Sequence, residues 1–267
     1  MRQAWSFALM LLLGGCATTG PRFDAAASLD RAAEDPWEPV NRRIHAFNDT
    51  LDRWFVRPVA DVYNRFAPVA IRRAVRNFYG NLAEPSNLVN ALAQGKFRSA
   101  GRAVERLAVN MTAGALGVAD EATRLGLDAQ PHDLGQTFAV WGVRSGPFVM
   151  LPFLGPSTVR DGVGQFLELF LDPVRYGRGV ALNPTQSLIE NAVEILSDRA
   201  ALIEQGEQIR RGSADDYATV RSAWLQLRRA ELYDGDPPVL EDDLEGYEDF
   251  KDEPSSPTPP EPGDDPP

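Results

Sequence analysis

The apolar residues of this chain recur mainly with the spacing of an α-helix, and this pattern restricts the fold more than any other feature. Between residues 40 and 55 they form one stripe along a helix: Val40, Ile44, Phe47, Leu51, Trp54 and Phe55. Similar patterns predict helices that open at Pro58, at Pro68 and at Ser86, that span 97–116, that begin at Ser157 or Thr158 and at Pro184, and that follow a capping box over 213–216. Strand signals are nearly absent, so the sequence predicts an all-α fold of short amphipathic helices.

The first nineteen residues have the features of an export signal. Arg2 precedes an apolar stretch of about nine residues, which is too short to span a bilayer. The stretch ends in Leu-Gly-Gly-Cys16, which resembles the bacterial lipobox, and Ala17 after it resembles the outer-membrane sorting pattern; a signal peptide that happens to contain a cysteine is the alternative. Cys16 is the only cysteine, so the chain has one thiol and no disulfide. We expect a signal peptide over 1–15, lipidation at Cys16 and a linker over 16–34.

The net charge of −11 comes from the C-terminal tail. Residues 231–267 hold fourteen acidic residues and one base, Lys251, whereas residues 16–230 carry 25 basic and 24 acidic side chains. The tail is also rich in proline and poor in apolar residues, so it cannot bury enough surface to offset its ordering entropy. We expect residues 234–267 to be a disordered acidic tail, either a solvated terminus or an interaction tail.

After the leader, no run of 18 or more apolar residues occurs, so the sequence predicts no transmembrane helix. Amphipathic helices can pack together as a soluble domain or lie partly in a membrane interface. Both arrangements produce the same apolar stripe, and periodicity alone favours the soluble bundle.

Residues typical of catalysis are sparse. The two histidines, His45 and His132, do not stand in a cluster with metal-ligand spacing. The chain has no G-x-S-x-G elbow, and GVGQF at 162–166 lacks the third glycine and the flanking strand of a nucleotide loop. We therefore expect no enzyme, no cofactor, no metal and no nucleic-acid partner.

Arginines form two basic groups. Arg98, Arg102 and Arg106 are spaced at i, i+4 and i+8 on one predicted helix, and Arg72, Arg73 and Arg76 form the second group. Two readings stay open for such groups: a solvated helix face, or contact with phosphate headgroups, which suit the planar guanidinium. We take Arg98, Arg102 and Arg106 as candidate headgroup contacts.

Several stretches together resemble one family. DPWEPVNRRIHAFNDTLD at 35–52 is similar to the D-P-x-E-x-x-N-R-x-x-x-x-F-N opening of the VacJ/MlaA lipoproteins. RPVADVYNRFAP, VRNFYGNLAEPSNLVNALAQG, DLGQTFAVWGVRSGPFVMLPFLGPSTVRDGVG and DDYATVRSAW follow in the order of that family. The match covers 35–233, which we assign to one VacJ/MlaA-like α-helical domain; the long acidic tail departs from the family pattern.

The resemblance implies a ring-like, lipid-anchored protein in the periplasmic leaflet of the outer membrane, with a central amphipathic channel. Such proteins associate with trimeric porins, remove mislocalised phospholipid from the outer leaflet and pass it to a periplasmic lipid carrier, which maintains lipid asymmetry. This reverses the preference for a soluble bundle, since the helix stripes can then face lipid. Two alternatives remain: a lipid-directed hydrolase, and a structural lipoprotein that tethers partners to the outer membrane.

The resemblance also implies a hairpin or loop beside the channel at about 142–156, where the seven apolar positions 148–154 include one proline. We expect the glycines to provide hinges and the prolines to exclude helix. The apolar side chains are then expected to border a lipid path rather than a conventional core. The residues of this channel-flanking hairpin are Gly142, Gly146, Pro147, Phe148, Leu151, Pro152, Phe153, Gly155 and Pro156.

Overall fold

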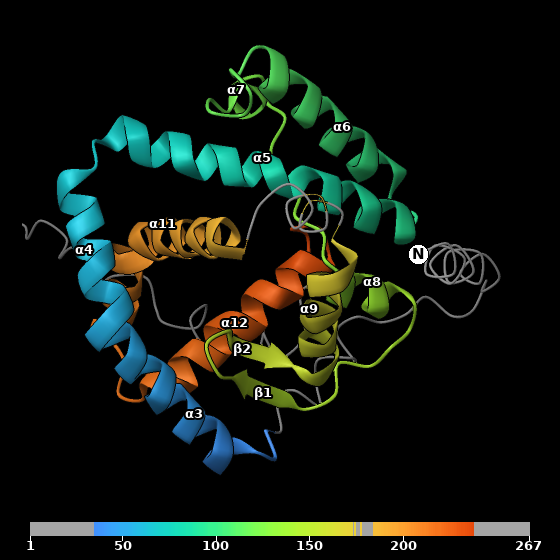
Figure 1. Ribbon diagram of the computed structural model, residues 1–267. Helices are drawn as coiled ribbons and strands as arrows, with labels where there is room; N and C mark the ends of the chain where they lie inside the picture. The colour runs from blue at the N-terminus through green and yellow to red at the C-terminus, as the bar shows by residue number, and fades with distance from the viewer. Residues whose placement is uncertain (1–34, 173, 175–176, 178–183, 238–267) are drawn as a thin grey trace, which may run out of the picture. The chain divides into compact units, whose positions relative to one another are not determined.

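The predicted all-α fold is confirmed by a computed structural model, which describes residues 35–172, 174, 177 and 184–237 (Figure 1). The predicted signal peptide, the lipidated Cys16, the linker and all but four residues of the acidic tail lie outside the described residues. The elements are α3 (Glu38–Leu51), the π-helical η2 (Asp52–Val56), α4 (Arg57–Phe66), α5 (Val69–Ala93), α6 (Phe97–Thr112), α7 (Glu121–Arg124), α8 (Leu134–Val140), β1 (Phe148–Leu151), β2 (Gly155–Thr158), α9 (Val159–Leu171), α11 (Pro184–Arg211) and α12 (Asp216–Leu232).

Helix starts follow the capping signals of the sequence. The predicted cap Thr158 accepts a hydrogen bond from the Asp161 amide at the start of α9. At α12 the expected box over 213–216 is shifted, because Asp215 rather than Ser213 is the cap and accepts from the Ala218 amide. Local hydrogen bonding therefore places these two helix starts to within a few residues.

Two predicted helix boundaries were wrong. The helix expected to begin at Ser86 is the second half of α5, which continues through Pro85. Proline removes one hydrogen bond from a helix of 25 residues. α5 also packs against both α11 and α6, with α11 beside its first half and α6 beside its second half (Figure 1). The helix expected over 97–116 ends at Thr112, because Ala115 and Leu116 take left-handed backbone angles (φ +51° and +62°).

The predicted hairpin is confirmed, and it is a short antiparallel β-hairpin. β1 and β2 pair in a register that runs from Phe148 opposite Thr158 to Leu151 opposite Gly155. Pro152, Phe153 and Leu154 form the connection, and Phe153 has a left-handed φ of +66° that is unusual for a bulky side chain.

Contacts between the elements form a closed circuit. α3 leads through η2 to α4, α4 contacts α11, α11 contacts α5, α5 contacts α8, α8 contacts α9, and α9 contacts β1, which returns to α3. α12 contacts β2, α8 and α11, and in Figure 1 it lies behind the hairpin. The circuit therefore brings α3, the hairpin, α11 and α12 around a common space.

Candidate functional site

The apolar stripe predicted on α3 points largely away from the protein. Its last two residues, Trp54 and Phe55 in η2, are 71% and 67% exposed, and Phe66 at the end of α4 is 75% exposed. The exposed apolar surface extends over neighbouring elements, with Val40, Phe47, Val59, Val62, Val69 and Ile71 along α3 to α5 and Val163, Phe166, Leu169, Phe170 and Leu171 along α9. Water-soluble monomers rarely expose apolar surface on this scale, so these faces are suited to lipid or to a partner.

Polar side chains, by contrast, fill the buried face of α5. Asn81, Glu84, Asn87 and Asn90 lie three positions apart and are all at least 92% buried. Asn87 accepts a hydrogen bond from the His132 amide, and Asn90 Oδ1 accepts from the Thr137 hydroxyl at 2.9 Å. Buried amides are stable when their hydrogen bonds are made, so Asn87 and Asn90 fix α5 against the segment 132–137.

Arg228 of α12 is the centre of a second buried polar group. Its guanidinium contacts Asp133 at 2.5 Å, Glu231 at 2.9 Å and Asp161 at 3.1 Å. Burial alone would lower the pKa of Arg228, but the hydrogen bonds and charges of Asp133 and then Asp161 outweigh burial and raise it. Burial alone would raise the pKa of Asp161, but Arg228 and then Arg160 outweigh burial and lower it. These charges tie α12 to α8 and α9.

Close helix contact supports the Arg228 group. A Cβ on Gly135 would lie 2.5 Å from Asp161 Oδ1, and one on Gly164 would lie 2.7 Å from the Gly135 amide nitrogen. GVGQF is therefore part of helix α9, and Gly164 permits α8 and α9 to touch.

The apolar run of the hairpin divides into two parts. Phe148 and Met150 are 0% and 2% exposed and form a small core with Tyr217 of α12, whereas Phe153 and Leu154 at the tip are 73% and 67% exposed. The expectation that the whole run avoids a conventional core is thus wrong for Phe148, because alternate positions of β1 point inward. Leu151 is half-buried, and Pro152 is exposed at the tip.

The three glycines predicted to provide hinges have positive φ angles, +88° at Gly142, +68° at Gly146 and +85° at Gly155. Their role as hinges stays a prediction. At Gly146 a Cβ would also approach Val159 Cβ at 3.1 Å. Pro147 directly precedes β1, and Pro156 lies in β2 opposite Met150.

Two asparagines of α3 hold β1 in place, and the sequence reasoning gave them no role. Asn41 donates to the Phe148 carbonyl and accepts from the Met150 amide, at 3.1 and 2.9 Å. Two helical turns further along α3, Asn48 donates to the Leu151 carbonyl and accepts from the Phe153 amide, both at 2.9 Å. Both asparagines stand in the family-like opening motif, which was the only signal that could have singled them out.

A cavity of about 630 Å³ lies where α3, the hairpin, α11 and α12 come together. Apolar side chains dominate its wall: Leu51, Val56, Met150, Phe153, Leu154, Ile195, Leu202, Ile203, Val220, Trp224 and Leu227. Two ion pairs also line it, Arg199 with Asp52 at 2.6 Å and Arg57 with Glu207. The tip of the hairpin thus forms part of the wall of an amphipathic cavity.

The three arginines predicted to share one face of α6 occupy different environments. Arg98 is exposed and Arg102 is half-buried, but Arg106 is only 4% exposed. Arg106 pairs with Glu84 and donates to the Thr123 hydroxyl and the Leu127 carbonyl. Eight positions turn a helix by about 80° beyond two full turns, so Arg106 faces α5, and the prediction of a headgroup contact at Arg106 was wrong.

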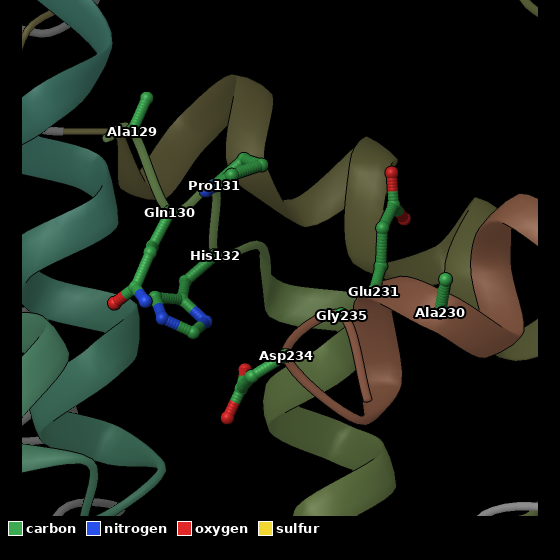
Figure 2. A pocket seen from close by; sticks show the side chains of 8 residues that line it. All are labelled: Ala129, Gln130, Pro131, His132, Ala230, Glu231, Asp234 and Gly235. Carbon is green, nitrogen blue, oxygen red and sulfur yellow. The ribbon is translucent and has the colours of Figure 1, made fainter. Parts of the chain in front are cut away.

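A smaller cavity of about 230 Å³ lies between the loop 129–132 and the end of α12 (Figure 2). Figure 2 shows His132 and Asp234 facing this space from opposite sides. The His132 ring bonds Gln136 through Nδ1 at 3.1 Å, and burial lowers its pKa. Asp234 pairs with Lys96 at 2.5 Å, and no residue of the hairpin lines this cavity.

Within the described ranges, no helix is long and apolar enough to cross a bilayer. In the same part of the chain, no three His, Cys, Asp or Glu side chains are grouped so that they could hold a metal ion.

Comparison with known proteins gives concordant matches. The family model described as MlaA lipoprotein matches residues 33–231. The Escherichia coli protein named intermembrane phospholipid transport system lipoprotein MlaA is 33% identical over 219 residues, which cover 80% of this chain and 82% of that protein. An uncharacterised protein of Rickettsia bellii is 33% identical over 203 residues, covering 76% and 78%.

A solved structure agrees with these matches. It was reported as "Structural basis for maintenance of bacterial outer membrane lipid asymmetry", and its chain superposes on this one with a TM-score of 0.62 at 31% identity. The superposition covers 76% of this chain and 99% of that chain. By sequence and by structure, this chain belongs to the MlaA lipoprotein family.

Proposed function

We propose that this protein is the outer-membrane lipoprotein of an intermembrane phospholipid transport system. It sits in the periplasmic leaflet, anchored by acyl chains on Cys16, and removes mislocalised phospholipid from the outer leaflet. The lipid passes through the amphipathic cavity and on to a periplasmic carrier, while a trimeric porin holds the protein in place. The relatives named for phospholipid transport support this role.

The cavity beside the hairpin is the observation that carries the proposal. A phospholipid that crosses a bilayer unaided must take its charged head through hydrocarbon, where unsatisfied polar groups are costly. A wall that combines apolar side chains with the Arg199–Asp52 and Arg57–Glu207 pairs offers surroundings to both parts of the lipid. The apolar surface of α3, α4 and α9 would hold this cavity at the level of the acyl chains.

The hairpin would control access to the cavity. Its tip lines the cavity through Phe153 and Leu154, while its base is fixed to α3 by Asn41. Asn48 holds the tip with two hydrogen bonds, as Asn41 holds the base, but it is the weaker clamp because its segment is half-buried to exposed. Movement about Gly155 and Gly142 would change the opening without breaking the core around Phe148.

The experiment measures surface phospholipid when the hairpin is free and when it is locked. In the native host lacking this gene, an impermeant amine reagent is expected to label more surface phosphatidylethanolamine, and the full chain should restore the low level. Cysteines at Phe47 and Phe153, whose rings lie 5.4 Å apart edge to face, would lock the tip to α3 when cross-linked. We expect the locked protein to fail and the same variant, reduced, to succeed.

Three outcomes would contradict the proposal. A deletion that leaves the surface lipid unchanged while the protein still captures a porin would indicate a tether. Lipid cleaved by the purified protein would indicate a hydrolase. Full rescue by the cross-linked protein would remove the role of the hairpin as a gate.

A further inference from the structure

A polar cavity between α4, α5 and α11 is not used by the proposed path. Its volume is about 160 Å³, which is room for a few water molecules or one small anion. It is lined by Tyr63, Asn64, Val69, Arg72, Arg73, Arg76, Ser197, Ala200 and Ala201. The lining therefore holds three arginines and no acidic residue.

Buried polar atoms at this cavity lack hydrogen-bond partners among the described residues. They are the Tyr63 hydroxyl, Arg72 Nε and Ser197 Oγ. Ser197 is only 3% exposed, so water at the surface of the protein does not satisfy its hydroxyl. Buried polar groups are almost always paired in folded proteins, and three orphaned donors around one cavity indicate a ligand that accepts hydrogen bonds.

The charge of the cavity is positive. Arg72 donates to Asn64 Oδ1 at 2.7 Å, which orients its guanidinium without neutralising it. In the part of the chain that the structure describes, Arg73 and Arg76 form no ion pair. Asp198 on α11 is close enough to Arg76 to feel its charge, but burial has the larger effect and raises the pKa of Asp198. The site thus favours an anion.

We propose that this cavity binds the phosphate group of a phospholipid, an inference that rests on the proposed lipid-transport function. The guanidinium groups match the phosphate oxygens in charge and geometry, and the Tyr63 and Ser197 hydroxyls complete the set of donors. The exposed side chains of Val62, Phe66 and Val69 flank the same helix ends and give the acyl chains an apolar surface. Inorganic phosphate has the same headgroup chemistry, so the test must separate the two sources.

The experiment measures binding to the purified full-length protein in detergent, with a short-chain phosphatidylglycerol as the probe. We expect the double variant R73Q/R76Q to bind this lipid at least tenfold more weakly than the native protein. R43Q/R124Q is the matched control, because it removes the same charge from two exposed helix positions that do not line this cavity, and it should bind within twofold of native. Diacylglycerol with the same acyl chains lacks the phosphate, so the two variants should bind it with equal affinity.

Competition identifies the source of the phosphate. Failure of millimolar inorganic phosphate to displace the lipid would support a lipid headgroup site. Displacement at concentrations similar to those of the lipid would overturn the lipid assignment and make the site one for free phosphate. Equal binding of phosphatidylglycerol by native protein and R73Q/R76Q would overturn the site itself, while the lipid-transport proposal would stand if the deletion strain still accumulates surface lipid.

Ser197→Ala guards against a folding artefact. Removal of an unpartnered buried hydroxyl should leave thermal stability unchanged or raise it without lipid, yet lower affinity for phosphatidylglycerol several-fold. A Ser197→Ala protein with native affinity would contradict the part given to this residue. The two proposals can also fail separately. If the purified protein binds lipid in the cavity but deletion of its gene leaves surface lipid unchanged, the transport function is refuted and the site is not.

Discussion

Water-soluble proteins bury apolar side chains and expose polar ones. In this protein α5 buries polar side chains, and the outer face from α3 to α4 exposes apolar ones. α5 buries Asn81, Glu84, Asn87 and Asn90, whereas the neighbouring helices expose Trp54, Phe55 and Phe66. Glu84, Asn87 and Asn90 can be buried because each finds a partner on α6 or in the segment 132–137. The outer face has no such compensation, so its stability depends on what covers it.

This difference teaches that the two faces hold the protein together in different ways. The interior uses directed hydrogen bonds and ion pairs, which fail when one partner is removed. The exterior uses apolar area, which contributes only when it leaves water. Substitutions on the two faces should therefore act on different measurements, and the following predictions separate them.

Loss of Arg228 should have the largest effect on folding. Arg228→Ala removes the cation beside the half-buried Asp133 and one of the two arginines that pair with the buried Asp161, whose other partner is Arg160. Loss of one partner of a buried ion pair costs about 3–5 kcal/mol. Arg98→Ala, at an exposed site, should change the free energy of unfolding by less than about 0.5 kcal/mol. Denaturant unfolding in detergent measures both. Equal small losses would contradict the account of the polar interior.

The two parts of the hairpin should differ almost as strongly. Phe148→Ala empties a fully buried position and should cost about 3–5 kcal/mol. Phe153→Ala at the tip should cost under about 1 kcal/mol, because its side chain is 73% exposed. If both variants unfold at the same denaturant concentration, the division of the hairpin into core and tip is wrong.

The pH dependence of the free energy of unfolding should reveal Glu168. Burial raises the pKa of Glu168 to about 7, and Asp133 and Asp172 add to the shift. A carboxyl group with a raised pKa in the folded state favours folding in its protonated form, so stability should fall as pH rises from about 4.5 to 7 and then level off. The full effect is on the order of 3 kcal/mol for a shift from 4.5 to about 7.

His132 acts in the opposite sense, because its lowered pKa makes stability fall as pH drops below about 6.5. The comparison of native protein with Glu168→Gln isolates the carboxyl. The variant should gain stability relative to native above pH 7 and match it near pH 4. A difference that does not change with pH would contradict the assignment.

The outer face should respond in membrane binding and not in folding. Trp54→Gln and Phe55→Gln should each weaken binding to vesicles by about tenfold, since burial of one large apolar side chain contributes about 1.5–3 kcal/mol. The measurement is made in a Cys16→Ser background so that acyl chains cannot mask the effect. Thr50→Gln, at an exposed polar position near the end of α3, is the control. Unchanged binding of both variants would exclude this face from contact with lipid.

Local patterns in the sequence predicted the helices and the cap at Thr158, because these depend on neighbours a few residues apart, whereas the hairpin was predicted from the resemblance to the family. It could not predict the direction of the α3 stripe, since periodicity shows that a face is apolar and not what covers it. Asn41 and Asn48 were missed because their partners lie more than 100 positions away. Arg106 was misplaced because its partner Glu84 stands on another helix. The positions of the cavities depend on such distant contacts and were likewise not predictable.

The emission of Trp54 tests the central claim most directly, namely that the exposed apolar face lies among lipid chains. In a lipidated protein whose other tryptophans are replaced by phenylalanine, vesicles would carry phospholipids spin-labelled on the acyl chains. The account predicts strong quenching of Trp54 by these lipids and little quenching by aqueous iodide. Quenching by iodide with no response to the labelled lipids would show that the face meets water and would contradict the account.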